Sequence, residues 1–236
     1  MSDSKIAIVM PTRNRPEKLE RFINSVVDTA EDLSRVSIYL YVDADDVVTM
    51  PKVTELSDKY PSLILCLVGP RTIHSHIANL LLPYVKEDIF FLGADDLIMR
   101  TKGWDKVICD FFDNHEDKVV LAYGDDLFQP NLATHPILHR NWVEAIGYLT
   151  PFYFEADFAD TWINDLAHKI NRKQKLDFVN EHMHFFARKM ELDQTFAENR
   201  NRYKNQDPEL VYKCLEPVRQ RDAQKLLNVM ESLKNA

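Results

Sequence analysis

The sequence predicts an α/β protein with a mainly parallel sheet flanked by helices. Short runs of apolar residues alternate with amphipathic stretches of about 10–16 residues, which is the pattern of repeated βα units. The apolar runs end in polar residues, as strands do at the carboxyl edge of such a sheet. A chain of 236 residues with 45% hydrophobic and 28% charged residues is long and apolar enough to form one packed domain.

The first half of the chain contains five expected strands and the helices that connect them. Pro16 suits the first turn of the first helix, and Leu19 and Phe22 begin its core face at helical spacing. Pro61 ends the second helix. The expected strands are residues 6–10, 36–42, 63–68, 89–92 and 118–123, and the later helices are residues 50–59, 73–85 and 102–115.

The pattern becomes less regular after about residue 127, where prolines and aromatic residues are frequent. We expect a helix over residues 158–171 and an alternating strand over residues 178–186. Residues from 207 onward are expected to be helical in two pieces, broken at Pro217. The chain therefore divides into residues 1–127 and 128–236, which we expect to form one continuous domain.

The bulk composition excludes several classes of protein. The net charge is −8, which argues against a surface for non-specific binding of nucleic acid or anionic membranes. Cys66, Cys109 and Cys214 are widely spaced, so neither a zinc site nor a disulfide framework is expected, and a reducing cytoplasm fits best. No window approaches ~18 uninterrupted apolar residues and the amino terminus is polar, so neither a membrane span nor a signal peptide is expected.

Glycine is scarce, and this scarcity limits how a nucleotide could be bound. None of the five glycines forms part of a GxGxxG or GxxxxGK loop. Dinucleotide-binding Rossmann enzymes and P-loop NTPases are therefore disfavoured.

The expected strand at residues 89–92 leads into two adjacent carboxylates, Asp95 and Asp96. Carboxylates at that edge of a sheet suit a hard cation such as Mg²⁺ or Mn²⁺. The alternative is an Asp-rich turn, because Asp favours turns and helix caps. Acid pairs also occur at residues 45–46 and 125–126, and together with Arg13, Arg15 and Arg71 they suggest a site for a metal-bound diphosphate.

Three stretches resemble family 2 nucleotide-sugar glycosyltransferases of the GT-A fold. They are Ile-Ala-Ile-Val-Met-Pro-Thr-Arg-Asn-Arg-Pro at residues 6–16, Val-Asp-Ala-Asp-Asp at residues 42–46, and Phe-Leu-Gly-Ala-Asp-Asp at residues 91–96. The resemblance covers roughly the first 125 residues; the second half resembles small phage and bacterial members more loosely. It implies a Rossmann-related, nucleotide-sugar-binding half, followed by an α+β acceptor half with a helical C-terminus. Gly93 stands where the family's DXD motif has its first acid.

The resemblance also implies a donor site and a metal site. Asp95, supported by Asp96, would hold Mn²⁺ or Mg²⁺ against the donor diphosphate. The residues expected to contact the nucleotide-diphosphate sugar are Pro11, Thr12, Arg13, Arg15, Asp43, Arg71, Asn79 and Asp95.

His182 and His184 fall on the same face of the expected strand, because side chains alternate with period two. Histidine is a suitable further ligand for a Mn²⁺-type ion. The alternative is that one histidine is buried in the core and the other packs on an aromatic ring.

An inverting sugar transfer needs a base that deprotonates the acceptor hydroxyl. In the resembling family this base is a carboxylate in the acceptor half, and the candidates here are Asp157 and Asp160. Asp157 could instead be the N-cap of the helix expected from residue 158.

The resemblance, together with these residues, implies a metal-dependent glycosyltransferase that moves a sugar from a nucleotide diphosphate to a hydroxyl acceptor with inversion. The acceptor classes considered are a glycan, a protein or a hydroxymethylated DNA base. A basic stretch containing Arg200, Arg202 and Lys204 is either a solvated face or a patch for an anionic acceptor such as DNA. The alternatives are a nucleotidyltransferase, a non-catalytic nucleotide-sugar-binding module and a two-metal nuclease.

Overall fold

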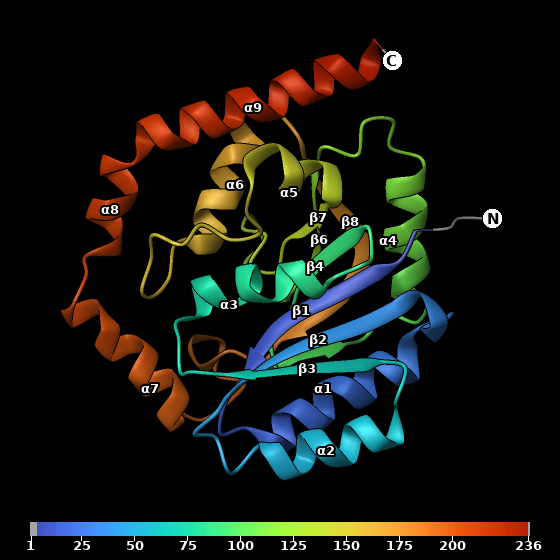
Figure 1. Ribbon diagram of the computed structural model, residues 1–236, viewed down its shortest axis with the longest axis vertical. Coiled ribbons are helices and arrows are strands. Elements are labelled where there is room, and N and C mark those ends of the chain that lie inside the picture. The colour runs from blue at the N-terminus through green and yellow to red at the C-terminus, as the bar shows by residue number, and fades with distance from the viewer. Residues whose placement is uncertain (1–3, 236) are drawn as a thin grey trace.

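The computed structural model describes residues 4–235, which form a mixed, mostly parallel sheet covered by helices on both faces (Figure 1). The strand order is β3-β2-β1-β4-β7-β6-β8-β5. The strands are β1 (Ile6–Thr12), β2 (Val36–Asp43), β3 (Ile64–Gly69), β4 (Ile89–Leu92), β5 (Leu97–Met99), β6 (Leu121–Asp125), β7 (Ile137–His139) and β8 (Lys173–His182). The helices are α1 (Pro16–Thr29), α2 (Met50–Lys59), α3 (His74–Leu81), α4 (Trp104–Asp113), α5 (Arg140–Ile146), α6 (Ala159–Lys169), α7 (Gln194–Asn201), α8 (Pro208–Cys214) and α9 (Glu216–Lys234).

The predicted α/β class is confirmed, and the parallel part of the sheet is formed by β3, β2, β1 and β4. Strand β1 lies in the middle of these four, with Ile6 paired to Val36 on one side and to Ile89 on the other. Its alternating side chains enter two different cores, which explains why the strand is apolar at every position. Because these strands are parallel, the polar residues that follow them gather at one edge of the sheet.

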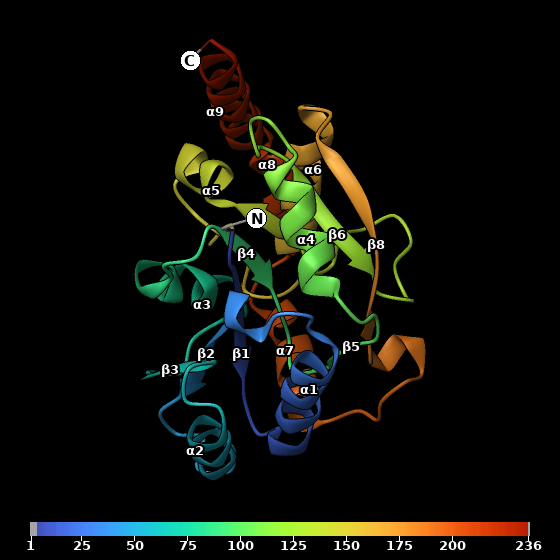
Figure 2. The same ribbon diagram turned by 90° about the vertical axis from the view of Figure 1, so that its right-hand side faces the viewer.

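Each face of the sheet is covered by its own set of helices. Helices α1, α2 and α4 pack on one face through residues such as Phe22, Leu56 and Trp104. Helices α3, α5, α6 and α9 pack on the other face. Figure 2 shows α3 and α5 on the opposite side of the strands from α4. No helix in residues 4–235 combines the length and the apolar character that crossing a membrane requires.

Four elements were not predicted, namely β5, β7, α5 and α7. Strands β5 and β7 have only three residues each, which is too short for a periodic pattern. Strand β7 inserts between β4 and β6 and is antiparallel to both, so β6 still runs parallel to β4. The predicted strand at residues 178–186 is shifted, because β8 begins at Lys173 and ends at His182, and a 3₁₀ turn follows at Phe185–Ala187.

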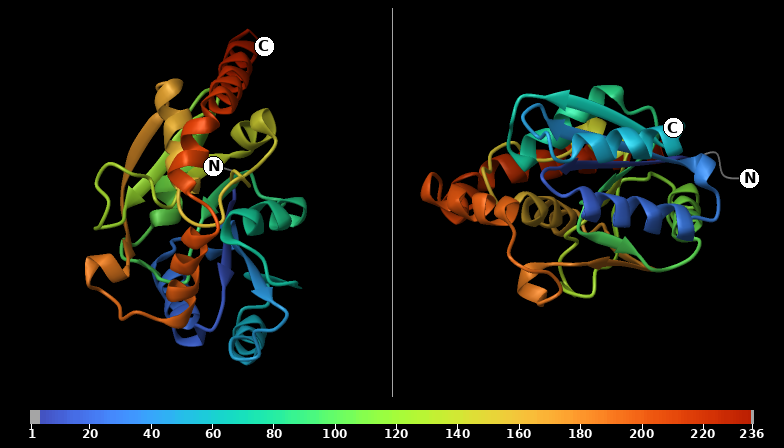
Figure 3. Two further views of the ribbon diagram at one scale, coloured as in Figure 1. Left: turned by 90° about the vertical axis from the view of Figure 1, so that its left-hand side faces the viewer. Right: turned by 90° about the horizontal axis from the view of Figure 1, so that it is seen from below.

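After β8 the chain leaves the sheet, and its last helix packs on helices α5 and α6. Figure 3 shows α7, α8 and α9 following one another along one side of the molecule, in orange to red. The predicted break between two C-terminal helices occurs at Leu215, and Pro217 lies in the first turn of α9. Helix α9 packs on α5 and α6, where the fully buried Asp222 accepts a hydrogen bond from the Tyr148 hydroxyl at 2.8 Å.

Candidate active site at the carboxyl ends of the parallel strands

A cavity of about 550 Å³ opens at the carboxyl edge of the parallel strands. Its walls come from the ends of β1, β2 and β4, the start of α3 and the turn before α6. Further walls are formed by residues 128–136, by the end of β8, and by residues 184–206, which include α7 and which we call the C-terminal arm. Twelve of the thirteen predicted site residues line this cavity, and Asn79 is the one that does not. The twelve are Pro11, Thr12, Arg13, Arg15, Asp43, Arg71, Asp95, Asp96, Asp157, Asp160, His182 and His184.

The turn after β1 forms the floor of the cavity. Asn14 adopts a left-handed backbone conformation with φ of 53°, and its N–H donates to Asp46 at 2.8 Å. Asn tolerates this conformation better than most residues. The turn directs the Thr12 hydroxyl toward Asp95, whose Oδ2 accepts its hydrogen bond at 2.9 Å. The Pro-Thr-Arg-Asn-Arg stretch therefore presents its side chains to the carboxylates that follow β4.

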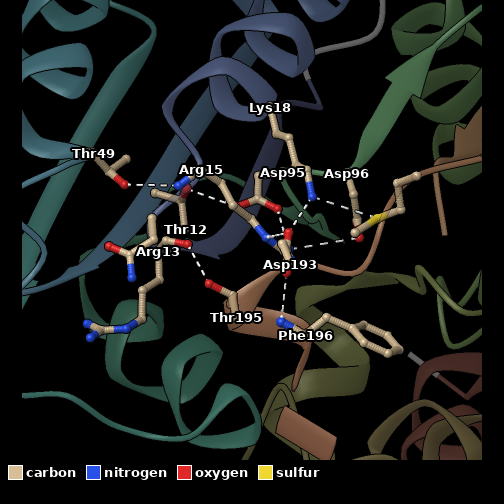
Figure 4. Close-up of polar contacts among 12 residues, drawn as sticks. Thr12, Arg13, Arg15, Lys18, Thr49, Asp95, Asp96, Asp193, Thr195 and Phe196 are labelled. Atoms are coloured by element: carbon tan, nitrogen blue, oxygen red, sulfur yellow. Dashed lines mark hydrogen bonds and ion pairs between the residues drawn. The ribbon is translucent and has the colours of Figure 1, made fainter. Parts of the chain in front are cut away.

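Arg15 lies between three carboxylates (Figure 4). Its Nη1 is 2.9 Å from Asp95 Oδ1 and 4.0 Å from Asp96, and its Nε donates to Asp193 at 2.8 Å. Burial raises the pKa of Asp95 above its usual range although Arg15 opposes this shift. Both oxygens of Asp95 are thus occupied, one by Arg15 and one by Thr12.

Asp96 lies beside a group of histidines. Its Oδ1 is 3.5 Å from His182 Nε2, and the rings of His182 and His135 are 4.8 Å apart. Burial opposes the ionisation of Asp96, but His182 and Arg15 outweigh it and hold the pKa of Asp96 well below its usual range. Three buried atoms in this group have no hydrogen-bond partner: Asp96 Oδ1, His182 Nδ1 and His135 Nε2. Unpaired buried polar atoms are costly, so they mark a place for a ligand.

The predicted set of four metal ligands is not a single cluster. Within residues 4–235 no three His, Cys, Asp or Glu side chains converge on a metal position. His184 stacks on Phe128 at 5.0 Å, and its Nδ1 accepts the Phe186 N–H, so it follows the aromatic-packing alternative. Asp96 and His182 retain free atoms, whereas Asp95 does not.

One end of the cavity is formed by residues at the ends of β1, β2 and β3. Arg13 Nη1 is 3.0 Å from Asp43 and also pairs with Asp45. This leaves Asp43 Oδ1 and Arg13 Nε buried without partners, an acceptor and a donor close to one another. Arg71, just beyond β3, forms an ion pair with Glu198 of the C-terminal arm.

Asn79 is the predicted donor contact that lies outside the cavity lining. Its amide nitrogen donates to the carbonyl of Thr150 at 2.7 Å, and its oxygen accepts from the N–H groups of Leu149 and Thr150. Its amide therefore fastens α3 to the loop before α6. The neighbouring Ala78 does line the cavity, so it is the direction of the Asn79 side chain, toward the Leu149–Thr150 backbone, that keeps it out.

Two of the three predicted acid pairs serve the backbone. Asp46 accepts from the N–H groups of Asn14, Val48 and Thr49. Asp126 accepts from the N–H groups that follow it and from Thr134, and Asp125 pairs with Lys175. None of these three carboxylates lines the cavity, so the turn interpretation holds for them.

The two candidate bases differ in their surroundings. Asp157 does not cap α6; it pairs with Arg200 and accepts a hydrogen bond from the Tyr203 hydroxyl at 2.5 Å. Asp160 has no ion pair among the described residues and accepts only from Thr161. Burial raises the pKa of Asp160 to about 6. Phe158, between them, has φ of 74°, a costly conformation for a bulky residue that is often found at functional sites.

Sequence reasoning assigned no role to two groups that shape the site. His135 precedes the unpredicted β7, and Asp193 starts the unpredicted α7, where it accepts from the Phe196 N–H. The N-cap pattern of Asp193 could have indicated a helix start. No local signal indicates that it lies beside Arg15, 178 positions earlier in the chain.

No protein-family model matches this sequence, and no curated protein is similar enough in sequence to count as a match. Solved structures do match its fold. The chain is similar to the mannosyltransferase PcManGT from Pyrobaculum calidifontis, solved with GDP-Man and Mn²⁺, with a TM-score of 0.59 and 10% identity over 100% of this chain and 79% of that one.

Two further structures match the same fold. S. aureus TarS 1–349 in complex with UDP-GlcNAc has a TM-score of 0.60 and 13% identity over 97% of this chain and 73% of that one. GalNAc-T7 with UDP, GalNAc and Mn²⁺ has a TM-score of 0.61 and 10% identity over 75% of this chain and 43% of that one. The protein therefore has a GT-A-like fold, as the sequence resemblance implied, whereas membership of family 2 is not shown.

Proposed function

We propose that this protein is a metal-dependent glycosyltransferase that moves a sugar from a nucleotide diphosphate to a hydroxyl acceptor. The observation that carries the proposal is one cavity containing buried, unpaired polar atoms at both ends, Asp43 Oδ1 at one and Asp96 Oδ1 at the other. The similar PcManGT and TarS structures hold GDP-Man and UDP-GlcNAc. A nucleotide sugar has a base at one end and a diphosphate in the middle. The base would suit the end of the cavity at Asp43, and the diphosphate would suit the end at Asp96.

The nucleotide would bind at the ends of β1 and β2. Asp43 Oδ1 accepts an N–H of the base, and Arg13 Nε donates to an adjacent ring acceptor. Pro11 and Thr12 line the path from there to Asp95. Arg71 is 43% exposed and paired only with Glu198, so it can exchange this partner for a donor phosphate.

Asp96 Oδ1, with His182 Nε2 3.5 Å away, would hold a Mn²⁺ or Mg²⁺ ion whose remaining ligands would be phosphate oxygens. When bound, the ion stabilises the negative charge that develops on the leaving nucleoside diphosphate. Arg15 neutralises Asp95 and thereby keeps the two adjacent carboxylates from repelling one another.

Asp160 is the base that fits best, because its carboxylate lines the cavity without a cationic partner. Its raised pKa gives it more basicity than an ordinary Asp while it remains ionised at neutral pH. Asp157 is engaged by Arg200 and Tyr203 and would hold the C-terminal arm. Attack by the deprotonated hydroxyl on the anomeric carbon inverts its configuration.

The acceptor side of the cavity is aromatic. Phe128, Phe186 and Phe196 line it, and Phe186 is 60% exposed. Exposed aromatic faces suit a sugar ring or a base, so the acceptor classes that fit are a glycan, a glycosylated protein or a hydroxymethylated DNA base.

The proposal is tested by thermal shift with a panel of nucleotide sugars, with and without Mn²⁺. We expect one donor to raise the melting temperature in the presence of Mn²⁺, and Asp96→Asn to abolish this shift. Asp125→Asn is the matched control, because Asp125 belongs to an acid pair outside the cavity. Release of pyrophosphate from a nucleoside triphosphate would instead indicate a nucleotidyltransferase, and donor binding without hydrolysis or transfer would indicate a binding module.

A further inference from the structure

The charged side chains that line the cavity are almost completely paired. Each of four arginines has a carboxylate partner among the described residues: Arg13 with Asp43, Arg15 with Asp95, Arg71 with Glu198 and Arg200 with Asp157. Arg202 is the fifth arginine in the lining, and it forms no ion pair within residues 4–235. The pairing pattern therefore leaves one guanidinium without a counter-ion.

Arg202 begins the 3₁₀ turn Arg202–Lys204 and is only partly exposed. The one contact of its guanidinium is with the carbonyl oxygen of Glu155, and at 3.5 Å this is at the limit of a hydrogen bond. Burial lowers the pKa of Arg202 and the nearby charge of Arg71 lowers it further, and together they outweigh the opposing charges of Asp43, Glu198 and Glu155, none of which is in ion-pair contact with it. A partly buried guanidinium beside a second cation is unfavourable unless an anion binds between them.

Two arginines from distant parts of the chain thus lie near one another in the cavity lining. Arg71 follows β3, whereas Arg202 belongs to the C-terminal arm, more than a hundred residues later in the chain. His74, at the start of α3, lines the same part of the cavity, and the charges of both Asp96 and Arg202 act on it. The amino-terminal end of α3, which has no side-chain cap, adds the positive end of a helix dipole.

We propose that Arg202 binds a phosphate of the nucleotide donor together with Arg71, so that the donor site is complete only when the C-terminal arm is in place. This inference rests on the proposed function, because the anion is the donor's diphosphate. Guanidinium groups bind phosphate through paired, charge-assisted hydrogen bonds, which Lys cannot reproduce in the same geometry. Donor binding then also fixes the arm, on which Phe186 and Phe196 line the acceptor side.

Titration calorimetry with UDP and GDP in the presence of Mn²⁺ tests the inference. We expect Arg202→Gln to weaken binding of the preferred nucleoside diphosphate by about tenfold or more, and to leave binding of the corresponding nucleoside unchanged. The matched control is Lys204→Gln, which removes the same charge two residues away on an exposed side chain outside the cavity lining. Arg202→Lys should recover only part of the loss, and it replaces Arg202→Gln if that variant does not fold.

Chymotrypsin digestion is the second measurement, because the arm contains Phe186, Phe196 and Tyr203. UDP or GDP with Mn²⁺ should protect the arm in the wild-type protein and in Lys204→Gln, but not in Arg202→Gln. Nucleoside diphosphate affinity in Arg202→Gln within twofold of wild type would overturn the inference and leave the proposed function intact. A wild-type protein that binds no nucleoside diphosphate would overturn both.

Discussion

The guanidinium of Arg15 and the carboxylate of Asp95 form an ion pair, with Nη1 2.9 Å from Oδ1, at the ends of two neighbouring strands. Strands β1 and β4 are paired in parallel, with Val9 opposite Leu92, so the residues that follow each strand meet at one edge. Arg15 also binds Asp193, so this ion pair connects the C-terminal arm to the parallel sheet.

Asp193→Asn should loosen the arm without unfolding the protein. Asp193 accepts from Arg15, pairs with Lys18 and caps α7, so its charge holds three elements together. We expect chymotrypsin to cleave the arm several-fold faster in this variant, with little change in melting temperature because Asp193 is partly exposed. Glu191→Gln, at an exposed neighbouring position, should leave the cleavage rate unchanged.

The same contact predicts an acid-induced opening of the arm. Burial opposes the ionisation of Asp193, but its hydrogen bonds from Arg15 and Lys18 lower its pKa to about 2, from an ordinary value of about 4. A depressed carboxyl pKa stabilises the folded contact above pH ~4, and this stabilisation is lost as the pH falls toward about 2. Pepsin should cleave the wild-type protein faster as the pH falls through this range. In Asp193→Asn the cleavage rate should lack the part of this pH dependence that comes from protonation of Asp193.

Turnover should depend on the ionisation of Asp160. Its pKa is raised to about 6, and the carboxylate is the active form, so turnover should fall as the pH drops below about 6. Asp160→Asn should lower kcat by roughly 10²–10⁴-fold and leave the donor KM nearly unchanged. Asp157→Asn is the comparison, measured in the same steady-state assay; a larger loss of kcat in that variant would move the role of base to Asp157.

A side chain at Gly93, where the resembling family has an acid, should destabilise the protein. A Cβ atom at Gly93 would lie 2.7 Å from Cγ2 of the fully buried Ile8, closer than real Cβ contacts allow. We expect Gly93→Ala, and more strongly Gly93→Asp, to lower the free energy of unfolding by about 1–3 kcal/mol in urea titrations. Ile8→Leu removes the Cγ2 methyl group, so Gly93→Ala should cost less in that background. Equal costs in both backgrounds would contradict the steric explanation.

Asp222→Ala should destabilise the packing of α9 against α6. Asp222 is completely buried and accepts from the Tyr148 hydroxyl, which in turn accepts from the Trp162 indole N–H at 2.8 Å. Loss of the carboxylate leaves the Tyr148 hydroxyl without its acceptor and should cost about 1–3 kcal/mol in urea unfolding. Asp177→Ala, on an exposed position of β8, should cost little. Donor affinity should be similar in both variants, because neither residue lines the cavity.

Much of the fold was predictable because local patterns report burial. The apolar run before Asp95 identified β4, and Phe22 and its neighbours identified the buried face of α1. The parallel order of the strands then implied that the Thr12–Arg15 turn would meet Asp95. The same reasoning overestimated the role of acid pairs, since Asp46 and Asp126 bind backbone N–H groups within their own turns or the adjacent one.

The sequence by itself determined the class of fold and the edge of the sheet where the cavity forms, because periodicity and strand ends are properties of short segments. Only the tertiary structure decided which side chains share that cavity. Arg202 comes beside Arg71, and His135 beside His182, through the path of residues 127–206, and contacts across so long a separation leave no local pattern in the chain. In the folded protein both oxygens of Asp95 accept hydrogen bonds, whereas Asp96 Oδ1 has no hydrogen-bond partner. The neighbouring side chains, and not the residue type, decide which polar atoms remain available.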